Sequence, residues 1–166
     1  ERYRELSHVE TRELNVGTST FEVQFNPARI RSTGATITKE AVAARPCFLC
    51  RKNRPEEQLT KIQDVDYELL VNPYPILPMH FTIPARRHHP QQIRGMYGEM
   101  IQLLSHYPEL MVFYNGPLCG ASAPDHAHLQ AGTSGVLPLQ KEWQRPSRNL
   151  TEVARRGDDA TLCGVE

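Results

Sequence analysis

The chain has 166 residues and a mass of 18.9 kDa, a length that suits one domain whose hydrophobic core needs no disulfide support. Lysine plus arginine and aspartate plus glutamate number 19 each, which argues against a net field that attracts nucleic acid or a membrane surface. No apolar run approaches the roughly 20 residues that span a bilayer, and no charged-then-apolar leader opens the chain, so we predict a soluble, cytoplasmic protein.

Two strands are predicted at the beginning of the chain, over residues 7–14 and 20–27, where polar and apolar residues alternate. A turn near residues 15–19 joins them, with Gly17 in the bend. The chain begins at Glu1 rather than at methionine, which indicates either an artificially shortened chain or part of a longer polypeptide.

Cys47 and Cys50 form a C-x-x-C pair, which suggests either a redox pair or half of a metal site. Redox pairs usually open a helix after a strand. Here the segment that follows is turn-like and broken by proline, which favours the metal site. His126 and either His88 or His89 could complete it, because two thiolates and two imidazoles make a closed tetrahedral site for a structural zinc ion.

Three further strands are predicted over residues 67–75, 80–85 and 110–116, which are rich in β-branched, aromatic and other apolar residues. A helix is predicted over residues 91–107, after Pro90, and should cover one face of the sheet. Its methionines are expected to pack in the core. The apolar residues at helical spacing are Ile93, Met96, Met100, Ile101 and Leu104.

Polar side chains occupy every second position at His126, His128 and Gln130, with apolar residues between them. Successive side chains of a strand point to opposite faces, so this spacing places the three on one face. The preceding loop, residues 115–122, is rich in glycine and small residues, which would let backbone N–H groups approach a phosphate. The segment therefore combines an imidazole-rich strand face with a candidate phosphate loop.

The composition becomes polar after Trp143, which divides the chain into a domain of residues 1–143 and a polar tail, or the start of a further segment, over 144–166. The predicted fold class is α+β, with a mostly antiparallel sheet and one principal helix packed on one face. No functional role is predicted for His8, His80 or His106, because a lone histidine usually packs or is solvated.

Three motifs together resemble the histidine-triad superfamily: C-x-x-C at 47–50, "LLVNPYPILPMHFTIPARRHH" at 69–89, and "NG…GAS…DHAHLQAG" at 115–132. More narrowly, they resemble its transferase branch, with His-x-His-x-Gln in place of a third histidine. That branch includes galactose-1-phosphate uridylyltransferases, diadenosine tetraphosphate phosphorylases and GDP-galactose phosphorylases. The resemblance covers about half of the chain and implies a HIT-like fold.

The resemblance implies a role for each matching residue. His128 would be the nucleophile that takes the nucleotidyl group, and Gln130 would bind a non-bridging phosphoryl oxygen. Ser122 and Asn115 would reach the phosphates, and Asn72 would contact the ribose. The positions that match the structural zinc ligands of the family are Cys47, Cys50, His88 and His126. His88 is preferred to His89 because it lies eight residues after His80, as the register of the family requires.

The glutamine also has a chemical explanation that does not depend on the resemblance. An unprotonated imidazole nitrogen can attack phosphorus if the other ring nitrogen donates to a backbone carbonyl, which we expect Asn115 to supply or fix. A glutamine does not titrate near neutrality and can only take part in hydrogen bonds. Gln130 therefore suits leaving groups that depart as anions, namely phosphates and sugar phosphates.

The sequence thus predicts a nucleotidyltransferase or phosphorylase that moves a nucleoside monophosphate from a nucleotide sugar or dinucleoside polyphosphate to phosphate or a sugar phosphate. The alternatives are a zinc-stabilised nucleotide-binding module without turnover and a hydrolase of nucleotide conjugates, which Gln130 argues against. We expect no nucleic acid or membrane partner, and the related folds suggest a possible homodimer.

Overall fold

The computed structural model describes residues 3–17, 19–27, 36–62, 66–142, 150–157 and 160–165. The chain forms two compact units, one of residues 1–12 with 24–133 and the other of residues 13–23 with 134–166. The first unit holds a five-stranded sheet and the candidate site. None of the helices in the described ranges has the length and apolar character required to cross a membrane.

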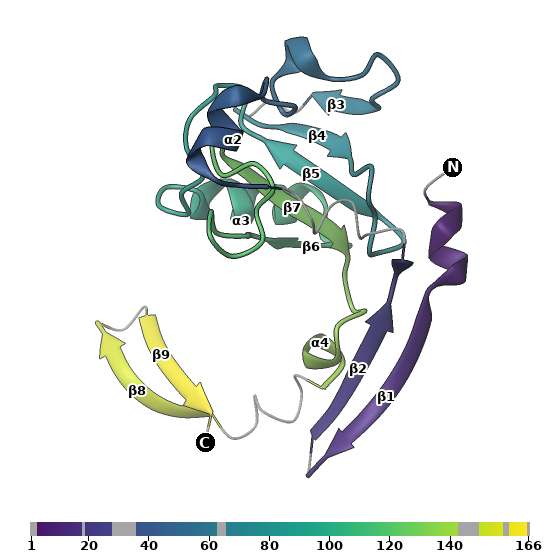
Figure 1. Cartoon of the computed structure of the whole chain (residues 1–166). Helices are drawn as coiled ribbons and strands as arrows, with labels where there is room; N and C mark the ends of the chain where they lie inside the picture. Colours follow the sequence, from purple (N-terminus) through teal and green to yellow (C-terminus); the bar gives the residue numbers. More distant parts are fainter. Residues whose placement is uncertain are drawn as a thin grey trace. The chain divides into compact units, whose positions relative to one another are not determined.

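The sheet of the first unit is antiparallel throughout, with strand order β3-β4-β5-β7-β6 (Figure 1). Its strands are β3 (Thr60–Ile62), β4 (Glu68–Val71), β5 (His80–Pro84), β6 (Leu110–Phe113) and β7 (His128–Thr133). Four of them lie in segments that the sequence predicts as strands, and β3 was not predicted. Together with α3 (Tyr97–His106), the sheet confirms the α+β class.

The register places the two faces of β7 in different surroundings. Leu129 and Ala131 are fully buried with Ile83 in the core, whereas His128 and Gln130 point to the other face. On that face Pro84 lies opposite His128 in the ladder. Further members of the core cluster are Tyr67, Leu69, Ala85, Met96, Leu103, Leu110 and Ala127.

Gly132 allows the chain to pass closely over the end of β7. A Cβ atom there would meet the Leu77 side chain and would lie 2.9 Å from the carbonyl oxygen of Met79. Real Cβ atoms do not approach backbone this closely. Glycine is therefore needed where the 73–79 connection packs against the strand that carries His128.

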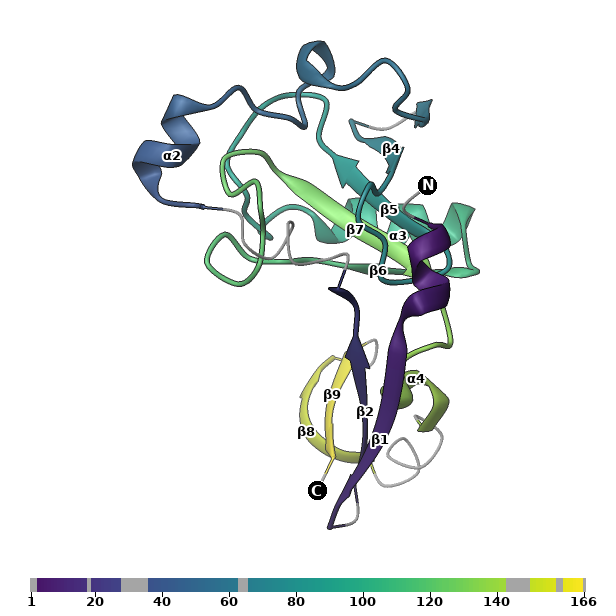
Figure 2. The ribbon, with the colours of Figure 1, turned by 45° about the vertical axis from the view of Figure 1, so that its right-hand side comes forward.

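The principal helix α3 covers the core face of the sheet, as Figures 1 and 2 both show. It begins six residues later than predicted, because Gly95 has a φ of 89°, outside the helical region. Met96 and Leu103 are buried and Met100 is partly buried, which confirms core packing for the methionines. Two other apolar residues at the same helical spacing are exposed, Ile101 at 67% and Leu104 at 37%.

Two hairpins contain the other four strands of the described residues. The predicted N-terminal hairpin is confirmed as β1 (Glu10–Val16) and β2 (Ser19–Phe25), with the 3-10 helix η1 (Arg4–His8) before it. Part of the segment expected to be a polar tail, 144–166, forms a second hairpin of β8 (Leu150–Arg156) and β9 (Ala160–Val165). The predicted boundary at Trp143 lies outside the described residues. The other helices are α2 (Lys39–Ala44), η3 (Arg51–Asn53) and α4 (Pro138–Glu142).

Candidate active site and metal centre

The C-x-x-C segment is a tight turn that is fastened to the sheet. The backbone N–H of Cys50 donates to the carbonyl of Cys47 at 3.2 Å, and η3 follows directly. Arg54 donates from Nε to the carbonyl of Leu49 at 2.8 Å and forms a buried ion pair with Glu68 of β4. The turn therefore presents both thiols from a fixed backbone, and it leads into a short 3-10 helix rather than into the α-helix of a redox pair.

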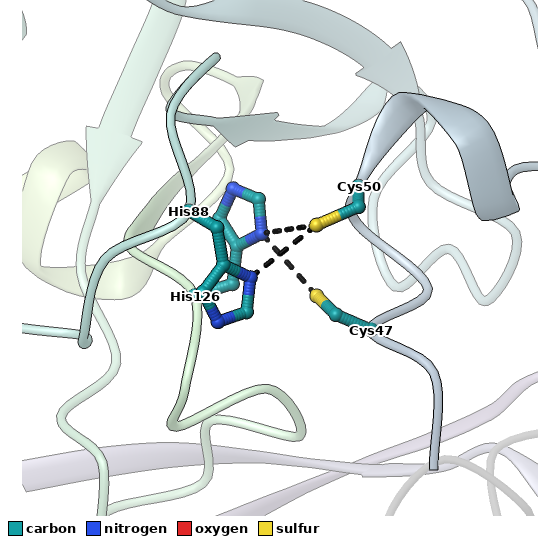
Figure 3. Close-up of side chains that lie close together, drawn as sticks. All are labelled: Cys47, Cys50, His88 and His126. Carbon is teal, nitrogen blue, oxygen red and sulfur yellow. Dashed lines mark hydrogen bonds between the residues drawn. The ribbon is translucent and has the colours of Figure 1, made fainter.

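The four predicted metal ligands lie together. One donor atom from each of Cys47, Cys50, His88 and His126 falls within 4.8 Å of all the others. Nδ1 of His126 lies 3.2 Å from Sγ of Cys47 and 3.6 Å from Sγ of Cys50 (Figure 3). Nδ1 of His88 lies 3.3 Å from Sγ of Cys50. The group could hold a metal ion, and it contains His88 rather than His89.

The ring of His126 presents a lone pair to the two thiols. Its Nε2 lies 2.7 Å from the carbonyl oxygen of Ala85, which can only accept, so Nε2 carries the proton and Nδ1 does not. Burial lowers the pKa of His126, which keeps the ring neutral, and burial raises the pKa of the Cys47 thiol. A metal ligand must present an unprotonated imidazole nitrogen, and His126 does so.

His126 does not share a strand with His128, contrary to the prediction from alternation. It lies in the bend before β7, where its backbone N–H donates to the carbonyl of Ala123 at 3.2 Å. Only His128 and Gln130 have strand geometry and a common face. The turn directs the His126 ring toward the cysteines instead of toward the face of Gln130.

The ring of His128 carries its proton on the other nitrogen, Nδ1. Its Nδ1 donates to the backbone carbonyl of His126 at 2.8 Å, which leaves the lone pair on Nε2. The expectation that Asn115 provides this carbonyl is wrong, because the local bend brings the carbonyl of His126 into place. The residue is only 5% exposed, and burial lowers the pKa of the ring. His128 is thus a neutral imidazole with an available Nε2.

His80 determines the orientation of the Gln130 amide, although no role was predicted for it. Nδ1 of His80 accepts from the N–H of Ile76 at 3.2 Å, so its Nε2 carries the proton and donates to Oε1 of Gln130 at 2.8 Å. The amide oxygen is engaged, and Nε2 of Gln130 has no hydrogen-bond partner among the described residues. Gln130 therefore offers a donor at the face that His128 occupies.

Asn72 lies next to this face but is engaged with its own surroundings. Its Nδ2 donates to the hydroxyl of Thr82 at 2.9 Å, and Thr82 lies opposite Gln130 in the ladder. Its Oδ1 accepts from the N–H of Tyr74 at 2.7 Å. These bonds are those of a residue that terminates a strand in a turn. The predicted ribose contact stays a prediction.

The phosphate-loop candidates are held at two separate points. The carbonyl of Asn115 accepts from Nε2 of Gln91 at 2.9 Å, and Gln91 also bonds to the backbone of His128. The carbonyl of Ser122 accepts from Arg45 at 3.2 Å, and the same guanidinium nitrogen is 3.1 Å from a carboxylate oxygen of Asp125. Asn115 is thus linked to His128 through Gln91, whereas no hydrogen bond links Ser122 to His128 within the described ranges.

Gln91 and His80 are the two residues near His128 that reasoning from the sequence missed. Both are about 1% exposed, and both act through hydrogen bonds to partners 24 to 50 residues away. The only signal in the sequence was the spacing of His80, which lies two and four residues before Thr82 and Pro84 on one predicted strand. This spacing places its side chain on the same face as theirs. Gln91 has no signal of this kind, since it precedes the helix in an irregular segment.

The fold and site define an α+β protein in which a Cys2His2 group lies beside a buried, neutral histidine on an antiparallel sheet. The chain belongs to the family described as Domain of unknown function (DUF4922), whose model matches residues 1–133. A comparison with curated protein sequences gave no match.

Among solved structures, the chain is similar to yeast Ap4A phosphorylase Apa2, with 19% sequence identity and a TM-score of 0.48. The similarity covers 93% of this chain and 49% of the yeast chain. The chain therefore spans about half the length of the structure that it matches.

Proposed function

We propose that the protein is a nucleotidyltransferase or phosphorylase that works through a covalent nucleotidyl-His128 intermediate. The donor is a nucleotide sugar or a dinucleoside polyphosphate, and the acceptor is phosphate or a sugar phosphate. The observation that carries the proposal is the hydrogen bond from Nδ1 of His128 to the carbonyl of His126, because it leaves an unprotonated Nε2 in a buried, neutral ring.

In the first step, Nε2 of His128 attacks the α-phosphorus of the donor. A P–N bond forms, and the P–O bond to the leaving group breaks with its electron pair on oxygen. The leaving group is a sugar phosphate when the donor is a nucleotide sugar and a nucleoside polyphosphate when the donor is a dinucleoside polyphosphate. The ring keeps its proton on Nδ1 and gains positive charge, which the carbonyl of His126 stabilises through the same hydrogen bond. No proton has to move, because the leaving group departs as an anion.

In the second step, a phosphate oxygen of the acceptor attacks phosphorus, the P–N bond breaks, and its electron pair returns to Nε2 of His128. This step also needs no general acid, in agreement with the presence of glutamine at position 130. The oriented amino group of Gln130 would donate to a non-bridging oxygen in both transition states. Asn115 and Ser122 would meet the remaining phosphate oxygens, and Asn72 the ribose.

Zinc is the metal that we propose for Cys47, Cys50, His88 and His126. Two sulfur and two nitrogen ligands suit a structural zinc ion, and the lone pair of His126 already faces both thiols. Such an ion would stabilise the segments that carry its ligands. The chemistry of transfer is assigned to His128 and Gln130.

The proposal is tested by intact-protein mass spectrometry at mildly alkaline pH, where a phosphoramidate survives. The protein is incubated in turn with UDP-glucose, GDP-sugars, ADP-sugars and diadenosine tetraphosphate. The expected result is an adduct of one nucleoside monophosphate, which also identifies the base. His128→Ala should give no adduct, and His8→Ala, which changes an exposed histidine outside the site, should behave as the native protein.

Two outcomes contradict the proposal. Measurable binding of a donor without an adduct would indicate a nucleotide-binding module without turnover. An adduct that is released to water at the same rate with or without phosphate or a sugar phosphate would indicate a hydrolase.

A further inference from the structure

Strand β7 remains paired with β5 at His128, the proposed nucleophile, but no longer pairs with β6 there. β6 and β7 pair from Leu110↔Thr133 to Phe113↔Gln130. Continuing this antiparallel register by two residues places Asn115 opposite His128. No backbone hydrogen bond joins these two residues in the described structure. The segments that follow β6 and precede β7 separate here, and the 115–122 loop begins.

The side chain of Gln91 lies between these two segments, at Asn115 and His128, and bonds to both. Its Oε1 accepts from the backbone N–H of His128 at 2.7 Å. Its Nε2 donates to the carbonyl of His128 and to the carbonyl of Asn115, both at 2.9 Å. The amide uses its oxygen and both of its N–H groups, and a flipped amide would direct donor against donor at His128. The Gln91 amide thus takes the place of a backbone peptide group and bonds to the backbone of both segments.

Gln91 is itself held rigidly. Its backbone N–H donates to the carbonyl of Pro124 at 3.1 Å, and the N–H of Ala127 donates to the carbonyl of His89 at 2.7 Å. The segment that contains Gln91 therefore runs beside the segment that leads into His128. The residue is 1% exposed, so its hydrogen bonds do not compete with water.

We propose that Gln91 is a positioning residue for His128, an inference that rests on the proposed function. It fixes the backbone of His128 on both sides of its Cα and sets the distance to the 115–122 loop, where the phosphates would lie. In-line attack depends on that distance. A displacement of about 1 Å of a reacting group can cost about a hundredfold in rate, even when the substrate still binds.

The test uses two substitutions of similar size. Gln91→Met keeps the length of the side chain but forms none of the three hydrogen bonds. Gln91→Glu keeps an acceptor for the N–H of His128 but directs a carboxylate at two carbonyl oxygens. Gln92→Met is the matched control, because Gln92 is the adjacent residue and is exposed.

The measurements are the single-turnover rate of adduct formation, the Kd of the donor, the bound metal and the unfolding midpoint. Gln91→Met should slow adduct formation by about a hundredfold and change the Kd by no more than about threefold, with metal content unchanged. Gln91→Glu should be slow as well, and Gln92→Met should match the native protein. A residue that only stabilised the fold would lower the unfolding midpoint without separating rate from Kd.

The outcomes distinguish this inference from the function on which it rests. If the native protein forms the adduct and Gln91→Met forms it at the native rate, the positioning role of Gln91 is overturned and the proposed function stands. If the native protein forms no adduct with any donor, the proposed function is overturned, and the role of Gln91 in it falls too. If Gln91→Met does not fold, the rate of Gln91→Glu decides.

Discussion

His126 and His128 lie two residues apart and present opposite ring nitrogens. His126 donates from Nε2 to the carbonyl of Ala85 and directs Nδ1 at two thiols. His128 donates from Nδ1 to the carbonyl of His126 and keeps Nε2 available. Backbone carbonyls thus decide which nitrogen of each ring can act, so that one ring suits a metal and the other suits phosphorus.

The same comparison separates two ways of holding a side chain. The Cys2His2 group is assembled from three distant segments of the chain and depends on the ligand chemistry of its members. The face around His128 is held by hydrogen bonds of amides and imidazoles to the backbone. His126 contributes its ring to the Cys2His2 group and its backbone carbonyl to the hydrogen bonds around His128. The two functions can therefore be separated at His128 but not at His126.

The largest effect is expected for His128→Ala. It removes the proposed nucleophile and should lower nucleotidyl transfer by at least about 10⁴-fold, with the metal content unchanged. His126→Ala, in contrast, should lose both the metal and the transfer, because the missing ligand releases the bend that supplies the carbonyl to His128. Transfer assays and metal analysis of both variants make this comparison. Normal transfer by His126→Ala without metal would refute the coupling of the two regions.

The opposite ring assignments can be measured directly. In ¹⁵N NMR spectra of the native protein, we expect the proton of neutral His128 on Nδ1 and that of His126 on Nε2. If both rings carried the proton on the same nitrogen, the proposed difference between His126 and His128 would be wrong, whatever the activity of the protein.

Removal of a metal ligand should have the next largest effect. Cys47→Ser should lose the metal and the stability that the metal confers, about 4 kcal/mol when free metal exceeds its Kd a thousandfold. For a chain of this size that corresponds to a fall of about 10 °C in the unfolding midpoint. Cys119→Ser is the matched control, since Cys119 is an exposed free cysteine outside the group. Metal analysis and thermal unfolding should change together in the first variant and not in the second.

Gln130→Ala should have an intermediate effect. Loss of one oriented donor to a phosphoryl oxygen costs about a hundredfold in rate. Gln130→His replaces the donor with a titratable group and should raise the rate of hydrolysis of the intermediate relative to transfer. Transfer and hydrolysis are measured on the isolated adduct with and without an acceptor. An unchanged ratio in Gln130→His would refute the argument that glutamine restricts the acceptor to anions.

The sequence predicted the four residues of the Cys2His2 group, which could hold a metal ion, and the common face of His128 and Gln130. Cysteines and histidines close together are typical of a metal site. Alternation predicted the strand face correctly for His128 and Gln130 but not for His126, which lies in the bend before the strand. The helix start could not be foreseen, because it depends on the left-handed conformation of Gly95. His80 and Gln91 were missed for a different reason. Their amide and imidazole groups acquire a role only through the register between β5 and β7 and the path of an irregular segment.

The smallest effect is expected at His80, where the two ring nitrogens can be replaced separately. His80→Gln can retain a donor near the place of Nε2, whereas His80→Asn retains only a group near Nδ1 and loses the bond to Gln130. The lost bond is worth about 1 kcal/mol, so His80→Asn should slow transfer by about fivefold to tenfold and His80→Gln by less. Single-turnover rates of the two variants, compared at equal metal content, measure the difference. A slower rate for His80→Gln than for His80→Asn would mean that His80 acts through its contact with Ile76, and that Gln130 is oriented by other means.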